Sequence, residues 1–249
     1  ILTYVTPDET SRLYEFRGSP GLVELDPTWY DSFLRFVISG FEHILSGLDH
    51  LLFIFCLVLP CRQLRPLIIT ITAFTCAHSI TLVAAAFGMV PKALWFPPLI
   101  EMLIAVSIVY MALENVIRNN FQQRWPIAFA FGLVHGFGFS FALSETLQFA
   151  GQHLITSLLS FNLGVEIGQV LMIIIAVPIL NYLFNSVISE KLGILVFSIL
   201  LAHTAWHWMV DRYAVLSAYQ FTLFPQGQIT TNEYFGWFAS PCMDRLKIR

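Results

Sequence analysis

Charged residues are scarce in this chain. Asp, Glu, Lys and Arg make up 12% of its 249 residues, hydrophobic residues make up 57%, and the mean hydropathy is +0.71. Water-soluble domains carry about 25% charged residues, so this composition excludes a protein that is solvated mainly by water. The net charge of −3 also excludes the basic surface with which nucleic-acid-binding proteins neutralise phosphates.

Cysteine patterns and the common catalytic motifs are missing as well. The four cysteines form no CxxC pair and no spacing typical of a zinc ribbon or a disulfide framework. The chain has no GxSxG, HExxH or Walker A motif and no GxGxxG that opens a helix after a strand. An ATP-driven or dinucleotide-using mechanism would therefore require another chain. No signal peptide is visible at the start of the chain, and we expect that a segment upstream of Ile1 has been removed.

Six apolar stretches are long enough to cross the hydrocarbon core of a membrane, which takes about 20 helical residues. They lie near residues 33–59, 66–89, 95–117, 126–148, 154–185 and 192–213, with proline, glycine or charged turns between them. We therefore predict an all-α fold, a polytopic membrane bundle of about six transmembrane helices at residues 31–213.

The two ends of the chain differ from the predicted bundle. Residues 1–30 contain strand-like stretches and turn residues, which fit either the remnant of a β-rich extracytoplasmic region or an unstructured arm. Residues 214–249 are typical of an interfacial or extramembrane tail. Lys and Arg concentrate in the loops after the first, third and fifth stretches, so the positive-inside rule predicts that the N-terminus lies outside.

Six of the seven histidines lie inside the predicted spans. A central Asp, Lys or Arg costs about 2.5 to 3.5 kcal/mol to insert into a membrane, so each polar group there is expected to face a partner or a cavity. A lone intramembrane histidine is more often a packing residue than a ligand. Six histidines together with Asp49 and Glu166 favour a shared metal or proton site.

The first span carries the densest group. His43 and His50 are seven residues apart, which places them on one face of an α-helix, two turns apart. Glu42 and Asp49 repeat this spacing on the adjacent stripe. Imidazoles beside carboxylates suit Zn, Ni, Co or Fe, and they also suit a proton relay.

The later spans each add a polar centre. His78 lies in a stripe of threonines, and both His135 and Glu166 lie inside GxxxG motifs, at which helices approach closely. In the last span His203 and His207 are four residues apart, a spacing that favours chelation of a metal.

Four stretches resemble the HupE/UreJ family of hydrogenase and urease accessory membrane proteins, and in particular the second branch of that family. They are GFEHILSGLDHLLF (40–53), TAFTCAHSITL (72–82), FGLVHGFGF (131–139) and FNLGVEIGQ (161–169). The resemblance implies a nickel-related role, either permeation or supply of metal to a hydrogenase or urease. It also implies a multi-pass protein of the bacterial inner membrane with a periplasmic N-terminal region.

Three hypotheses follow. The first is a permease or accessory protein for a divalent transition metal (nickel, zinc or cobalt), in which His43, Asp49 and His50 form the core site and the remaining candidates complete a path: His78, His135, Glu166, His203 and His207. The second, less favoured, is an intramembrane metal-dependent hydrolase that acts on a lipid or membrane-embedded substrate. The third is a structural or assembly subunit of a larger membrane complex. Expected partners are the bilayer, the metal ion and other membrane subunits, and no nucleic acid.

Overall fold

The computed structural model describes the backbone at residues 2–5, 11–14, 28–117, 124–147 and 153–219, and the side chains within 28–117, 124–139 and 153–219. Most of the predicted 214–249 tail and of the predicted 1–30 segment therefore lies outside the described residues.

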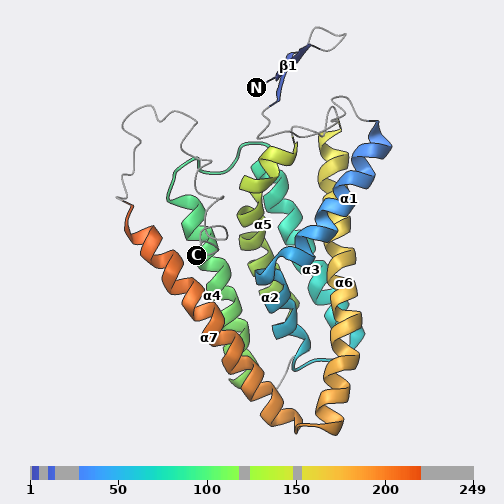
Figure 1. Ribbon diagram of the computed structural model, residues 1–249, viewed down its shortest axis with the longest axis vertical. Coiled ribbons are helices and arrows are strands. Elements are labelled where there is room, and N and C mark those ends of the chain that lie inside the picture. Colours follow the sequence, from blue (N-terminus) through green and yellow to red (C-terminus); the bar gives the residue numbers. More distant parts are fainter. Residues whose placement is uncertain (1, 6–10, 15–27, 118–123, 148–152, 220–249) are drawn as a thin grey trace, which may run out of the picture.

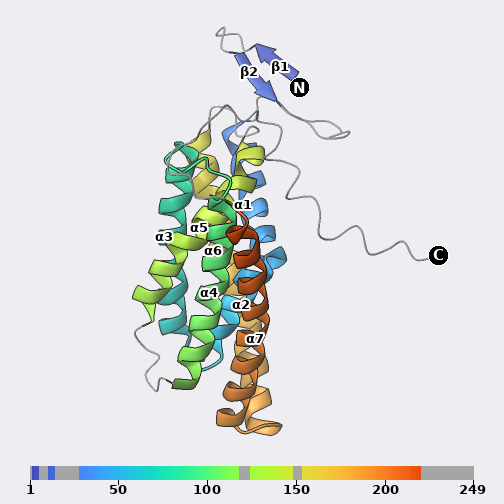
Figure 2. The same ribbon diagram turned by 90° about the vertical axis from the view of Figure 1, so that its left-hand side faces the viewer.

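The described part of the chain forms a helical bundle with a small hairpin at one end (Figures 1 and 2). The hairpin pairs β1 (Leu2–Val5) with β2 (Ser11–Tyr14) in antiparallel register. The helices are α1 (Trp29–Ser46), α2 (Leu48–Val58), α3 (Leu64–Ala86), α4 (Phe96–Ile117), α5 (Trp125–Leu147), α6 (Leu154–Ser186) and α7 (Glu190–Ser217). The prediction of an all-α bundle is confirmed for these residues.

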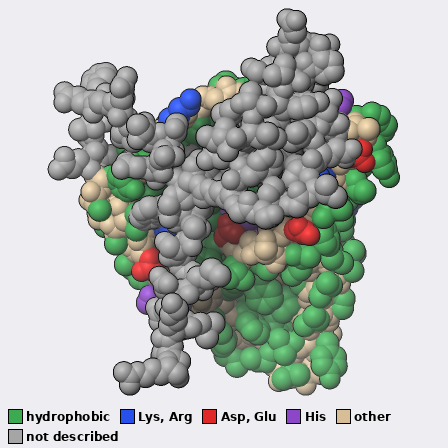
Figure 3. Space-filling model, turned by 45° about the horizontal axis from the view of Figure 1, so that its top comes forward, with side chains coloured by type: hydrophobic (Ala, Val, Ile, Leu, Met, Phe, Trp, Pro, Cys, Tyr) green, Lys and Arg blue, Asp and Glu red, His purple; other side chains and the backbone are tan. Residues whose placement is uncertain are grey.

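Four helices, α3, α4, α6 and α7, are long and apolar enough to cross a membrane. The pair α1 and α2 makes a fifth if it is counted as one span, and α5 qualifies only as a shorter apolar helix over Trp125–Phe139. The prediction of transmembrane helices is therefore confirmed. Four or five of them are found among the described residues, and the predicted number of six is not confirmed. Figure 3 shows the apolar flank of the bundle, interrupted by a few acidic and histidine side chains.

The first predicted span, 33–59, is not one continuous helix. It breaks at Gly47, where α1 and α2 meet at 71°. The N–H of Gly47 still donates to the His43 carbonyl (2.9 Å), and its own carbonyl accepts from the Leu51 N–H (3.0 Å). A Cβ at this position would lie 2.8 Å from the His43 carbonyl oxygen, so the break requires glycine. The prediction of a continuous helix is wrong here, because glycine weakens a helix and permits this close turn.

Three helix pairs hold the bundle together: α1 with α6, α3 with α5, and α4 with α7. In the first pair a Cβ on Gly40 would collide with the Phe161 carbonyl, and a Cβ on Gly164 would collide with the Val37 carbonyl. Gly132 of α5 meets the backbone of α3 in the same way. Small residues let membrane helices approach this closely, and the approach draws α1, α3, α5 and α6 around a common interior.

Candidate metal centre

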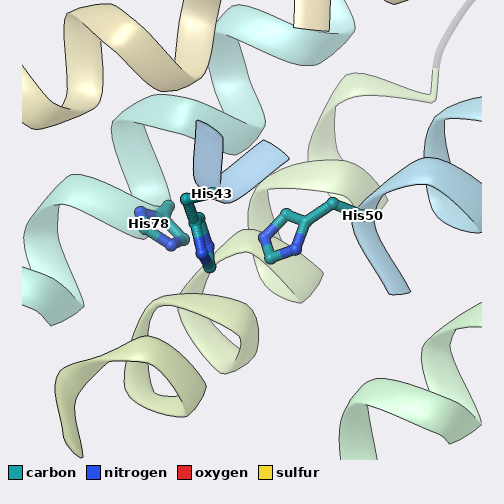
Figure 4. A group of neighbouring side chains, drawn as sticks. All are labelled: His43, His50 and His78. Atoms are coloured by element: carbon teal, nitrogen blue, oxygen red, sulfur yellow. The ribbon is translucent and has the colours of Figure 1, made fainter. Parts of the chain in front are cut away.

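Four of the predicted histidines meet in that interior. His43 lies in the last turn of α1, His50 in the first turn of α2, His78 on α3 and His135 on α5. The ring centroid of His50 is 4.8 Å from that of His43, 6.1 Å from that of His78 and 5.1 Å from that of His135. Figure 4 shows three of these rings, His43, His50 and His78, pointing toward one another from separate helices. The structure thus brings together histidines from four helices, and the outermost two, His43 and His135, are 92 positions apart in the sequence.

Asp49 orients the central histidine of this cluster. Its Oδ1 lies 3.2 Å from His50 Nδ1, and both residues stand in the first turn of α2. A carboxylate accepts, so Nδ1 is the donor and Nε2 keeps its lone pair. The N–H groups in the first turn of a helix point away from its body, so the start of α2 favours a negative charge at this place. A Cβ on Gly47 would lie 3.1 Å from both Asp49 Oδ1 and His50 Nδ1, so this glycine also leaves room for the pair.

Asn162 of α6 fixes the tautomer of His78. The Asn162 amide group donates to the Leu158 carbonyl (2.8 Å), so its oxygen is the atom that lies 3.2 Å from His78 Nδ1. His78 must therefore donate from Nδ1, which leaves a lone pair on Nε2. Histidines that bind metals commonly donate their outer N–H to an acceptor in this way.

Ser107 of α4 has the same effect on His135. The Ser107 hydroxyl donates its single hydrogen to the Ile104 carbonyl (2.6 Å), and its oxygen lies 3.0 Å from His135 Nε2. The ring must therefore donate from Nε2 and keep a lone pair on Nδ1. Ser107 was not predicted, because a single serine in an apolar helix carries no signal in the sequence.

The inner nitrogens of the cluster have no hydrogen-bond partner among the described residues. They are Nε2 of His43, His50 and His78 and Nδ1 of His135, all buried. Leaving a buried polar atom unpaired costs about 1 to 3 kcal/mol, and four such atoms in one place are suited to binding one shared cation. The nitrogens that lack a partner on His50, His78 and His135 are the ones that the outer hydrogen bonds leave with a lone pair, as a metal ion requires.

The spacing of the possible ligand atoms in the cluster is close to that of a metal site. Ligand atoms of His43, His50 and His78 all lie within 4.8 Å of one another, as do those of Asp49, His50 and His135. Around a tetrahedral ion with bonds of about 2.1 Å, ligand atoms are roughly 3.4 Å apart, so small side-chain movements of about 1 Å would close either group. His50 belongs to both groups and is the residue on which the site depends most.

Aromatic rings enclose the cluster. His43 packs against Phe139 and Phe161, with ring centroids 4.0 and 5.5 Å away, and these two phenylalanines stack on each other at 4.6 Å. Phe53 and Phe74 contact His135 at 5.3 and 5.1 Å. These rings exclude water and hold the imidazoles in place, which strengthens any electrostatic interaction inside.

The two ends of the bundle differ in their access to this cluster. Toward the hairpin end, Asp49 is 31% exposed, and Glu101 is 30% exposed and pairs with Arg212 at 3.0 Å. Toward the other end, α2 continues with fully apolar side chains, and Phe53, Leu57 and their neighbours to position 59 are buried or nearly so. Partly exposed acids therefore lie on one side of the cluster, and buried apolar side chains of α2 lie on the other.

Three predicted residues lie elsewhere. The carboxylate of Glu166 on α6 accepts a hydrogen bond from Thr72 on α3, next to a second bond between Thr75 and Gln169 (3.1 Å). His203 and His207 lie side by side on an exposed face of α7, with ring centroids 4.6 Å apart. None of the three belongs to the metal-compatible groups found among the described residues.

Comparison with known proteins adds one match. A family model described as HupE / UreJ protein matches residues 21–212, which include the whole cluster. Searches of curated proteins and of solved structures gave no match.

Proposed function

Because this chain belongs to the HupE / UreJ family, a membrane family linked to metal handling, we propose that it binds a divalent transition metal inside the membrane and passes it across or onward. Nickel is the first ion to test, followed by cobalt and zinc. The observation that carries the proposal is the convergence of four buried imidazole nitrogens, without hydrogen-bond partners among the described residues, next to one carboxylate.

The chemistry of the site suits an ion that must be stripped of water. Neutral imidazoles from His43, His50, His78 and His135 and the Asp49 carboxylate would replace the hydration shell of a borderline metal, for which nitrogen ligands are preferred. Two ligand groups that share His50 offer the ion two neighbouring positions. Neighbouring sites of moderate strength allow an ion to enter and also to leave.

The partly exposed acids support loading from the hairpin end. Partly exposed carboxylates at Glu101 and Asp49 raise the local concentration of cations at that entrance. If the N-terminus lies outside, as the loop charges predict, Asp49 and Glu101 lie on the periplasmic side of the cluster. Release to the other side then requires that α2 moves, and the break at Gly47 is the point at which it can pivot.

The test measures metal content and uptake together. The protein is purified in detergent, loaded with Ni²⁺ and reconstituted in liposomes, and His50→Ala is compared with the wild type and with His153→Ala, a histidine outside the cluster. We expect His50→Ala to lose more than about 100-fold in metal affinity, because it removes the ligand common to both groups. Unchanged binding and uptake in His50→Ala would refute the proposal.

A metal-dependent hydrolase is the second candidate, and one observation favours it. Asp49 lies beside histidine nitrogens of the cluster and is partly exposed, as a carboxylate that activates a metal-bound water would be. The two functions differ in how firmly the metal is held. An enzyme retains about one equivalent through chelator washing, whereas a carrier releases the ion as it exchanges.

A further inference from the structure

A polar stripe runs along the outside of α7, far from the cluster. It consists of His203, His207 and Asp211, which follow one another at intervals of four residues, and all three are exposed. The helix packs on the bundle through its opposite side, where Leu201 and Ala205 are buried. His203 lies 13 residues from the start and 14 residues from the end of α7 (190 to 217), about 20 Å from either end, so it sits at the middle of the helix, and the stripe runs from there toward the C-terminal end, where Asp211 lies about 9 Å from the last residue.

Imidazoles at this depth cannot face hydrocarbon without a partner. The neighbouring Thr204 donates its hydroxyl hydrogen to the Leu200 carbonyl (3.0 Å) and is satisfied within its own helix. In the part of the chain that the structure describes, neither His203 nor His207 has a hydrogen bond, and their ring contact is with each other. Polar groups in the membrane are expensive unless something covers them, so the stripe requires a covering surface.

The pair is half of a metal site. Histidines at positions i and i+4 can bind one ion together, but two ligands leave a tetrahedral metal incomplete. No third ligand residue completes a group with them among the described residues. A second copy of the chain with the same orientation in the membrane is related by a two-fold axis along the membrane normal, and that axis can run beside α7. It would bring His203 and His207 of both copies to the same depth and supply four imidazoles.

We propose that two copies of this chain associate through the exposed face of α7 and share one divalent metal ion bound by His203 and His207 of each. Leu200 and Val196 lie on the same face and are exposed, so apolar packing would surround the ion. Asp211, one turn beyond His207, is placed to accept the outer N–H of that ring, as carboxylates do in many metal sites. This site is independent of the central cluster and of its proposed role.

The first test compares oligomeric state with metal content, using Zn²⁺ as the probe and the full chain in nanodiscs. The wild type should be dimeric with about one and a half ions per chain, one in each cluster and one shared. The double variant His203→Ala/His207→Ala should be monomeric with about one ion per chain, and its dimer dissociation constant should rise by at least about 100-fold. Thr204→Ala, which changes the same helix without removing a ligand, should remain dimeric.

Two variants separate this proposal from the proposed function. His50→Ala should stay dimeric while it loses the central ion and retains about half an ion per chain. A wild type that is dimeric with only about half an ion per chain would refute the central site and support the shared site on α7. A monomeric wild type, or a dimer that survives both chelation and the double variant, would overturn the shared site.

Cross-linking locates the interface directly. In a background without native cysteines, Leu200→Cys should be joined into dimers by a short bis-maleimide when Zn²⁺ is present. Leu195→Cys is a matched control, since it is also exposed but lies about 140° away around the helix. Efficient cross-linking at Leu195 and none at Leu200 would place the interface elsewhere and refute the proposal.

Discussion

Replacement of Asn162 by alanine isolates the contribution of the outer hydrogen bonds to metal binding. Asn162 is buried on α6 and does not belong to the metal-compatible groups. Its oxygen accepts from His78 Nδ1 at 3.2 Å, and its amide group is held by the Leu158 carbonyl. Without this acceptor His78 can rotate or move its proton to Nε2, and the lone pair that faces the cluster is lost for part of the time.

The size of the effect follows from known partners of metal-binding histidines. Loss of such a partner reduces metal affinity by about 10- to 100-fold, which corresponds to about 1.4 to 2.7 kcal/mol. We expect the upper part of this range, because His78 is fully buried and no water can replace the missing acceptor.

Asn115 provides the matched control for this experiment. It is also a buried asparagine on a membrane helix, and its amide group donates to the Cys56 carbonyl at 2.9 Å, away from the histidine cluster. Both alanine variants should lower thermal stability by a similar amount, and only Asn162→Ala should weaken Ni²⁺ binding in a competition assay with a chromophoric chelator. Equal affinities for the two variants would refute the role of Asn162.

Three further substitutions test separate parts of the site. Ser107→Ala should weaken Ni²⁺ affinity by about 10-fold in the same competition assay, since His135 loses the acceptor that fixes its tautomer. Gly47→Ala should lower the Ni²⁺ affinity by at least about 10-fold, because the new Cβ would crowd the paired side chains of Asp49 and His50. Equilibrium dialysis would measure this loss of affinity. Glu101→Gln should slow uptake into liposomes roughly 2- to 10-fold at low ionic strength while equilibrium affinity is kept, whereas Glu190→Gln, an acid in an ion pair at the opposite end, should leave the rate unchanged.

The controls for the first two substitutions lie on other parts of the chain. Ser157 is fully buried, and its hydroxyl has no hydrogen-bond partner among the described residues, so Ser157→Ala should retain the affinity. A Cβ on Gly88 would have no described atom of another residue within 4 Å, and the φ of +73° makes Gly88→Ala a purely local strain. A loss of affinity in either control that equals the loss in its test variant would show that the effect is general destabilisation.

Most of the fold could be predicted because the length of each apolar stretch can be read directly from the sequence. The stretch 66–89 corresponds to α3, 95–117 to α4 and 154–185 to α6, each within a few residues. A lipid environment demands long apolar helices whatever their neighbours are. Hydropathy cannot reveal which helices pair, and the pairing of α1 with α6 depends on backbone contacts at Gly40 and Gly164 that only the assembled bundle displays.

The candidate site could be predicted only in part, for a related physical reason. Helical spacing shows which residues share a face, but it does not show whether that face turns inward. His78 and His135 face the interior. His203 and His207 face outward, although their spacing of four residues on one helix favours chelation. Glu166 faces α3 and finds a hydroxyl partner there. Residue type and spacing marked all of these residues as candidate ligands. Which of them face the interior depends on how each helix packs.

The break at Gly47 is what turns the first pair of histidines into a site. In one continuous helix the Cα atoms of His43 and His50 would be separated by about 10.5 Å along the axis, seven residues at 1.5 Å each. At that separation the two imidazoles could bind one ion only if both side chains extended along the helix toward each other. The 71° bend instead brings the ring centroids to 4.8 Å and places Asp49 and His50 at a new helix N-terminus. A straightened α1 and α2 would therefore separate the rings of His43 and His50, and under the proposed function a change of the bend at Gly47 would release the ion.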